Sequence, residues 1–184
     1  DLTGSINSTS RTHLFRTIHM QGFSENWFVD IGMDNFQILN ESIANYDKPH
    51  RILPYVDFNG QWINKKSNLS YGLGLNLAHF DSNTNVSGTR FHAMPNLSKT
   101  INFNGLKIKP EIQLDLTSYN LDESADHVLE EDRPNRTVPI YSLDIQALFK
   151  KNWEDKGYMQ TLEPRILGVY IPFKNQDDFP IFDS

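Results

Sequence analysis

The sequence predicts an all-β fold, an antiparallel meander of about eight strands that forms a segment of a large transmembrane β-barrel. Three observations support this prediction. The stretch Leu106–Tyr119 alternates strictly between apolar and polar residues, so a strand there has one apolar and one polar face. No segment shows helical periodicity. Short and long connections between these stretches alternate along the chain, as they do in bacterial outer-membrane barrels.

The alternation alone leaves two architectures open. A strand with one apolar face fits a β-sandwich, where that face lies against a second sheet, or a barrel wall, where it contacts lipid. About 9 to 11 tilted residues let a strand cross a bilayer, and Leu106–Tyr119 is long enough. The mean hydropathy of -0.52 does not decide between them, because a barrel exposes only every second residue to lipid.

The predicted strands follow one another along the whole chain. Residues 11–21 place apolar side chains on one face, which Arg16 interrupts, and residues 27–34 alternate from Trp27 onward. The cleanest alternation is at 68–80, where every second residue from Leu69 to Leu77 is apolar and the other face carries small or polar residues. The remaining predicted strands are 51–59, 90–98, 106–119, 141–150 and 160–171. The apolar face of 51–59 is made of Ile52, Pro54, Val56 and Phe58.

The predicted connections alternate in length. The shorter ones are 22–26, 60–66, 102–105 and 151–158. The longer ones are 38–50, 81–88, 120–137 and whatever follows residue 172. Residues 120–137 are the most acidic segment and are interpreted as a solvated loop.

Five prolines fall within or at the start of predicted strands. Proline has no N–H, so each one removes a hydrogen bond from a ladder. They predict either bulges that bend the sheet or a wall with incomplete pairing, and bulges are the favoured interpretation. The five are Pro54, Pro95, Pro110, Pro139 and Pro164.

Composition excludes several classes of function. A net charge of -6 argues against nucleic acid, which requires clustered Lys and Arg. There is no run of about 18 apolar residues and no cysteine, so neither a transmembrane helix nor thiolate chemistry is predicted. The 6 histidines lack metal-ligand spacing, and no motif for catalysis or phosphate binding occurs. We therefore expect no enzyme activity, no metal and no cofactor.

The C-terminal third carries a specific resemblance. The run QTLEPR at 160–165, followed by YIPFKNQ at 170–176, is similar to the LPS-assembly protein family LptD, also called the organic solvent tolerance family. RILP at 51–54 and RFHAMP at 90–95 fit weaker patterns of that family, and the similarity covers essentially the whole chain. The matched signature positions, for which we expect a structural role, are Glu163, Pro164, Arg165, Tyr170, Pro172 and Gln176.

The resemblance implies transport without covalent chemistry. It implies a large barrel in the outer membrane of a Gram-negative bacterium that is plugged by the lipoprotein LptE and inserts lipopolysaccharide into the outer leaflet. It also implies a periplasmic bridge protein that delivers lipopolysaccharide through a jellyroll domain. Residues 1–184 lack that jellyroll, begin at Asp1 and end in loop-like sequence, so we expect a partial barrel domain without the first and last barrel strands.

The alternation also predicts which side chains face the lumen. Glu163 and Arg165 share a face and are expected to form an ion pair there. Aromatic residues near strand ends, among them Trp27, Phe80, Tyr119 and Phe173, favour membrane girdles, although they could equally cap a sandwich core. The runner-up functions are a passive porin and a soluble β-sandwich that binds carbohydrate. The candidate lumen-facing residues are Lys107, Lys109, Glu111, Gln113, Asp115, Asp144 and Gln146.

Overall fold

The structure is a computed structural model that describes residues 13–39, 48–83, 85–122, 132–154 and 157–175. These residues form a nine-stranded antiparallel sheet with the order β1-β2-β3-β4-β5-β7-β8-β11, in which β6 also pairs with β7, and a two-stranded sheet of β9 and β10. The predicted antiparallel meander is confirmed. The strands are β1 (His13–Phe23), β2 (Trp27–Ile38), β3 (Arg51–Asn64), β4 (Leu69–Asp81), β5 (Ser87–Lys99), β6 (Ile101–Phe103), β7 (Leu106–Asp122), β8 (Asn135–Ala147), β9 (Phe149–Trp153), β10 (Tyr158–Leu162) and β11 (Arg165–Tyr170).

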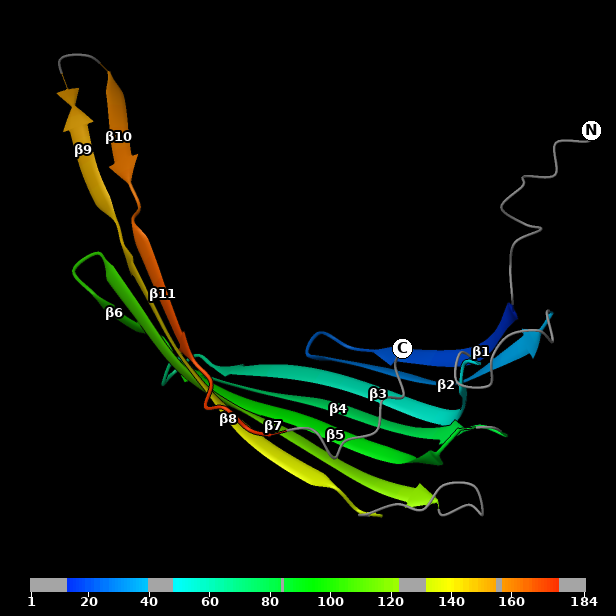
Figure 1. Cartoon of the computed structure of the whole chain (residues 1–184). Helices are drawn as coiled ribbons and strands as arrows, with labels where there is room; N and C mark the ends of the chain where they lie inside the picture. Colours follow the sequence, from blue (N-terminus) through cyan, green and yellow to red (C-terminus); the bar gives the residue numbers. More distant parts are fainter. Residues whose placement is uncertain (1–12, 40–47, 84, 123–131, 155–156, 176–184) are drawn as a thin grey trace, which may run out of the picture.

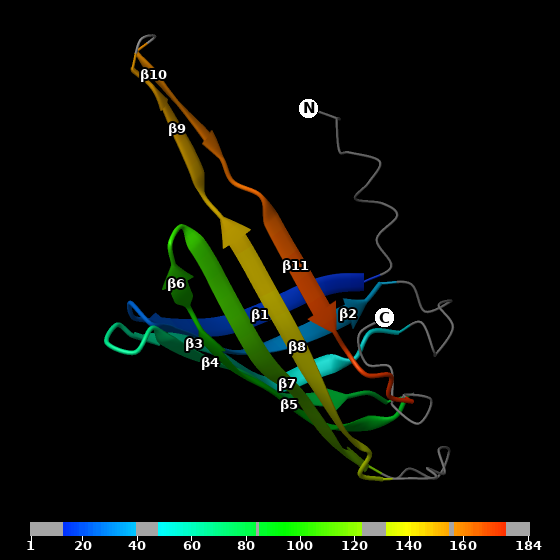
Figure 2. The same cartoon turned by 90° about the vertical axis from the view of Figure 1, so that its left-hand side faces the viewer.

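The main sheet is a single curved layer (Figure 1). A view from the side shows the same layer bending from β1 to β11, with the β9–β10 hairpin rising from one end of it (Figure 2). Within the described ranges, no helix has the length and apolar character needed to cross a membrane. Neither view shows a second layer of described strands against the sheet.

The pairing register divides the side chains of the sheet into two faces. Val56 of β3 pairs with Leu77 of β4, and Leu77 pairs with Phe91 of β5, so these three lie on one face, the apolar face. Their neighbours along the strands lie on the other side, the polar face, where Asp57 pairs with Asn76. The alternation read from the sequence therefore survives as two distinct surfaces.

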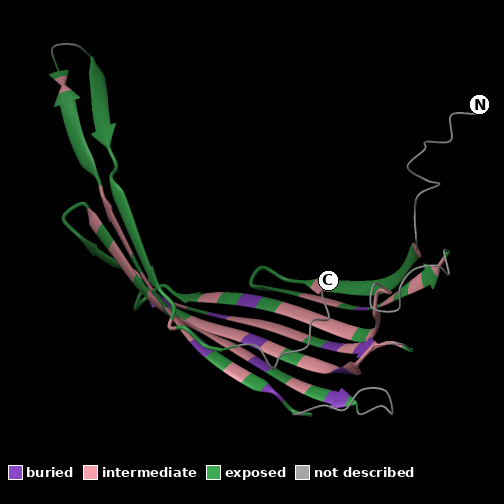
Figure 3. Ribbon diagram, viewed as in Figure 1, coloured by how far each residue is buried: buried purple, intermediate pink, exposed green. Residues whose placement is uncertain are grey.

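The polar face is the more crowded of the two. Figure 3 shows buried positions along the central strands and mostly exposed ones on β1 and on the β9–β10 hairpin. Side chains converge on the inside of a curved sheet, so this crowding indicates that the sheet bends toward its polar face. The buried side chains on that face are Ala78, Phe80, Ser98, Thr117, Leu121 and Val138, while Ala93 is buried on the apolar face.

Pro54 lies in a β-bulge, as predicted. The register of β3 shifts against both neighbouring strands between Ile52 and Tyr55. Ile52 pairs with Phe80 and packs against it on the polar face, so its predicted place beside Val56 on the apolar face is wrong. The extra residue of the bulge moves the side chains at this end of the strand to the opposite faces of the sheet.

The prediction of bulges is wrong for Pro110 and Pro139. Each keeps the regular register between β7 and β8. At Pro95 the ladder between β5 and β7 is interrupted without a shift of register. Among these four prolines, Pro54 therefore accompanies a bulge and Pro95 an incomplete ladder.

The strands β8 to β11 form one long hairpin with a break. Tyr141 pairs with Tyr170 and Trp153 pairs with Tyr158 in the same continuous register. The ladder is interrupted at Leu148 and at Glu163–Pro164, where Ala147 N donates to Pro164 O at 3.0 Å. The predicted uninterrupted strands 141–150 and 160–171 are therefore each divided in two.

The short connections are tighter than expected. β3 continues to Asn64, inside the predicted 60–66 turn, and β6 occupies part of the predicted 102–105 turn. The chain reverses there at Asn104 and Gly105, whose φ angles of 45° and 81° lie in the left-handed region. Asn-Gly is the dipeptide that such two-residue hairpin turns prefer. The acidic loop is also shorter, because β7 extends to Asp122 and β8 begins at Asn135.

Candidate functional site

A continuous row of polar side chains crosses seven strands on the polar face. Each member pairs directly with the next across the sheet. The row starts near the short turn that follows β1 and ends beside the first residue of β8, the strand next to the edge strand β11. We name it the polar row, and its members are Gln21, Asp30, Asp57, Asn76, His92, Thr117 and Arg136.

Asp115 joins the C-terminal part of the polar row. The Nε2 atom of His92 lies 3.1 Å from Asp115 Oδ1, and the Thr117 hydroxyl donates to the same oxygen at 3.2 Å. Arg136 donates to both carboxylate oxygens of Asp115 at 3.2 Å. Residues of β5, β7 and β8 thus converge on one half-buried carboxylate, which ties three strands together through charge-assisted hydrogen bonds.

The middle of the polar row is bonded in the same way. Asn76 donates to Asp57 Oδ1 at 2.6 Å and accepts from Arg90 at 3.2 Å. The guanidinium of Arg90 also lies over the Phe80 ring, 5.0 Å from its centroid. At the N-terminal end, Gln21 donates to Asp30 at 3.1 Å. The row therefore contains three hydrogen-bonded groups: Gln21 with Asp30, Asp57 with Asn76, and the residues around Asp115.

A glycine in β4 gives polar side chains room to meet across the face. A Cβ atom at Gly72 would lie 2.4 Å from Gln61 Oε1 and 2.6 Å from Asn96 Nδ2. Gln61 and Asn96 pair with Gly72 from the two neighbouring strands. The small residues on this face of β4 thus let longer polar groups from β3 and β5 approach each other.

One end of the polar face is apolar, which the sequence interpretation missed. Phe80 is 1% exposed and packs with Ala78 and Leu121, and Tyr119 lies against this cluster. Phe80 and Tyr119 therefore contribute to a packed cluster on the polar face, and their predicted place in a membrane girdle is wrong. The alternation held the signal, because continuing it beyond Asn76 puts Ala78 and Phe80 on the polar side.

The candidate lumen-facing residues do share one face. Lys107 pairs with Gln146, and Lys109 pairs with Asp144. Lys109 also forms an ion pair with Glu111 at 2.7 Å. The lumen itself stays a prediction. The full set on the polar face is Lys107, Lys109, Glu111, Gln113, Asp115, Asp144 and Gln146.

The signature residues are divided among different places. Glu163 and Pro164 form the break between β10 and β11. The Arg165 guanidinium donates to the two oxygens of Asp144 at 2.8 and 2.7 Å, where Glu163 was the expected partner. Tyr170 stacks against Tyr141, with ring centroids 6.4 Å apart, on the apolar face. Pro172 follows β11 and is half-buried, whereas Gln176 lies outside the described residues.

Comparison with known proteins gives a consistent result. The family model described as LptD: LPS transport system D matches residues 1–184. Proteins named LPS-assembly protein LptD from Nitrosospira multiformis, Thiobacillus denitrificans and Nitrosomonas eutropha are 32%, 32% and 33% identical to this chain. Each match covers 100% of this chain but only 20%, 25% and 26% of the relative, so the chain spans about a fifth to a quarter of their length.

Proposed function

This chain belongs to the LptD family, and we propose that residues 1–184 form part of the wall of a transmembrane β-barrel that inserts lipopolysaccharide into the outer leaflet of the outer membrane. The observation that carries the proposal is the exposed apolar face behind a bonded polar face. Large apolar side chains on β1 and β2 are uncovered, with Ile18 80% and Met20 69% exposed. In a barrel these side chains contact lipid, so their apolar surface is shielded from water without a second sheet.

The apolar face of β4 has the dimension that a bilayer requires. Its alternating apolar residues run from Leu69 to Leu77, about 27 Å along the strand. At the tilt of about 35–45° found in transmembrane barrels, this covers roughly 20 Å of the apolar band. A stacked Trp62–Tyr71 pair lies within the turn end of this band, and the Arg51–Asp81 ion pair lies beyond its loop end.

The polar face fits the wall of a hydrated lumen. Its charges have mixed signs and neutralise one another in pairs, such as Arg136 with Asp115 and Lys109 with Glu111. A wall of this kind can pass the sugar portion of a glycolipid without holding it tightly, while the acyl chains leave toward lipid. A lipoprotein plug of the LptE type and a periplasmic bridge protein complete the proposed machinery.

Two alternatives remain as outcomes of experiment. A β-sandwich that binds carbohydrate requires a second sheet on the apolar face, and the part of the chain that the structure describes contains one curved sheet and a small hairpin. A passive porin shares every structural feature of the proposed wall but transports solutes without selecting a lipid. The two alternatives need different tests.

The first test places a fluorescent probe at Ile112 or at Gln113 of the full-length protein in bilayers that contain bromine-labelled lipid. These neighbours lie on opposite faces of β7. We expect strong quenching at Ile112 and little at Gln113. Quenching at neither position means that the apolar face is covered by protein, which rejects the barrel.

The second test separates a transporter from a porin. A photo-crosslinking amino acid at Gln113 or Asn96, both on the polar face, is introduced into the full-length protein during active lipopolysaccharide export. We expect crosslinks to lipopolysaccharide that disappear when export is blocked. If no crosslinks form and small sugars diffuse through the protein in a liposome-swelling assay, the protein is a porin.

A further inference from the structure

A polar hollow interrupts the apolar face at the loop end of β1 to β4. The hollow has a volume of about 740 Å³ and is open to solvent. It contains three cationic side chains and one carboxylate, although the whole chain carries a net charge of -6. Its lining includes Arg16, Asn35, Gln37, Lys48, Arg51 and Asp81.

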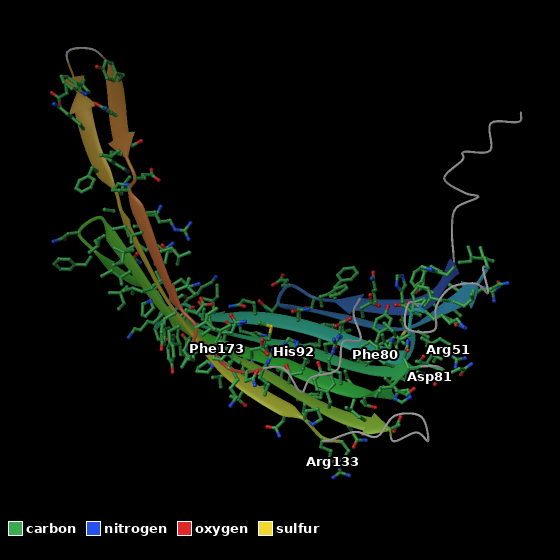
Figure 4. The ribbon with its side chains drawn as sticks, in the orientation of Figure 1. Arg51, Phe80, Asp81, His92, Arg133 and Phe173 are labelled. Atoms are coloured by element: carbon green, nitrogen blue, oxygen red, sulfur yellow. The ribbon has the colours of Figure 1, made fainter. Side chains whose placement is uncertain are left out.

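The register places the charged strand residues of this hollow on the apolar face, whereas Phe36 and Ile38, which also line it, alternate to the polar face. Arg16 pairs with Asn35, two residues from the exposed Ile18 and Met33 pair on the same face. Arg51 pairs with Asp81, which lies four residues beyond Leu77 in β4 and so on the same face. Figure 4 shows Arg51 and Asp81 together at this end of the sheet, with Phe80 beside them.

The charges of the hollow lie near the loop ends of their strands. A cation on the lipid-facing side is much more costly at the bilayer midplane than near the interface. Arg51 is the first residue of β3, on the side of the long connections, and Arg16 lies near the same end of β1, with Leu14 beyond it on the same face. In the proposed barrel this is the level of the headgroups of the outer leaflet.

The side chains are held in place as donors. Arg16 donates to Gln37 across the hairpin of β1 and β2. Arg51 forms a 2.6 Å ion pair with Asp81 and donates to Asn83 at 3.0 Å. The strands that carry the two guanidinium groups lie on either side of β2, about 10 Å apart. Guanidinium groups carried by two strands at this separation can contact an anionic group larger than one phosphate.

We propose that this hollow binds the phosphorylated headgroup of an anionic glycolipid in the outer leaflet, on the outside of the barrel wall. The inference rests on the proposed function, because it requires the apolar face to contact lipid. Arg16 and Lys48 supply the phosphate contacts, and Arg51 is oriented by Asp81. The acyl chains of the same lipid lie along the exposed side chains of Ile18 and Met33.

The test uses the full-length protein with its partner subunit in phosphatidylcholine nanodiscs that contain diphosphoryl lipid A. The number of lipid A molecules retained is measured by native mass spectrometry for the wild type and for Arg16→Gln combined with Lys48→Gln. We expect about a tenfold loss of retention, since charge-assisted contacts to phosphate are removed. Lys65→Gln combined with Lys66→Gln, at the opposite end of β3, is the control with the same charge change and should retain the lipid.

Two further experiments ask whether the bound anion is the lipid phosphate, and whether a negative result rejects the headgroup site alone or the membrane wall as well. Replacing lipid A with its dephosphorylated form should abolish the difference between wild type and variant, while millimolar inorganic phosphate should not displace the lipid. Equal loss with the dephosphorylated lipid, or displacement by phosphate, overturns the proposal. A probe at Ile18 is read with bromine-labelled lipid in parallel. Quenching there with no loss of lipid A rejects only the headgroup site, whereas no quenching rejects the membrane wall as well.

Discussion

The cluster around Phe80 and the hairpin of β9 and β10 are opposites within one chain. Phe80 is 1% exposed and lies on a strand that is paired along both edges. Phe149 of β9 is 59% exposed, and its strand pairs only with β10 among the described residues. Both regions continue the same alternation, so pattern alone does not determine packing. The number of paired neighbours and the curvature of the sheet do.

Stability is expected to be concentrated in the central strands of the main sheet. A side chain on the crowded polar face of a central strand contacts neighbours from two flanking strands, whereas one on the hairpin contacts a single partner strand. Local opening is therefore expected to begin at the break near Glu163 and Pro164, and to reach the Phe80 cluster last.

Removing the Phe80 ring should give the largest difference between the two regions. Phe80→Ala leaves a cavity against Ala78 and Leu121 and is expected to lower the free energy of unfolding by about 3–5 kcal/mol. Phe149→Ala is the matched control and should cost far less, because its ring is exposed. Urea titration of the full-length protein in phospholipid vesicles measures both. Equal costs would show that the cluster is not the more stable region.

Replacing each of two glycines by alanine tests the same difference in packing between the central strands and the C-terminal part of the sheet. A Cβ atom at Gly88 of β5 would lie 2.7 Å from the backbone oxygen of Asn120, which has no room to move. Gly88→Ala is therefore expected to destabilise the protein by about 2 kcal/mol. A Cβ atom at Gly168 of β11 meets nothing within 4 Å, so Gly168→Ala should leave the urea midpoint unchanged. A midpoint lowered equally by both substitutions contradicts the difference in packing.

The smallest expected difference concerns two carboxylates on the polar face. Asp115→Asn weakens the hydrogen bonds from Arg136, His92 and Thr117 and should cost about 1 kcal/mol. Asp144→Asn changes an exposed pair with Arg165 and should cost less. A double-mutant cycle of Asp115→Asn with Arg136→Gln should reveal coupling between the two residues. Additive effects would mean that Asp115 does not connect β7 to β8 energetically.

The sequence was sufficient for the strands and their two faces. Alternation predicted the stretches from Leu69 to Leu77 and from Leu106 to Leu116 because neighbouring side chains of a strand must point to opposite sides. The candidate residues of β7 and β8 fall on one face for the same reason. Periodicity is a local property, and here the fold follows it closely.

Features that depend on several strands were not predictable in this way. The bulge at Pro54 moves Ile52 to the other face, and alternation within one strand carries no information about an inserted residue. The polar row requires the register of six strand pairs, which the sequence does not specify. His92 and Arg136 were missed because each is unremarkable until Asp115 is placed between them.

The path of the polar row has a geometric consequence. It starts at Gln21, near the turn that ends β1, and reaches Arg136 beside the first residue of β8, at the loop end of the sheet. Because strands in a barrel are inclined, a line at right angles to them climbs around the wall like the thread of a screw. At a spacing of about 4.8 Å and an inclination near 45°, the row climbs roughly 20 Å over its seven strands. In the proposed barrel, the hydrogen-bonding groups of the polar row therefore lie at successive depths of the wall.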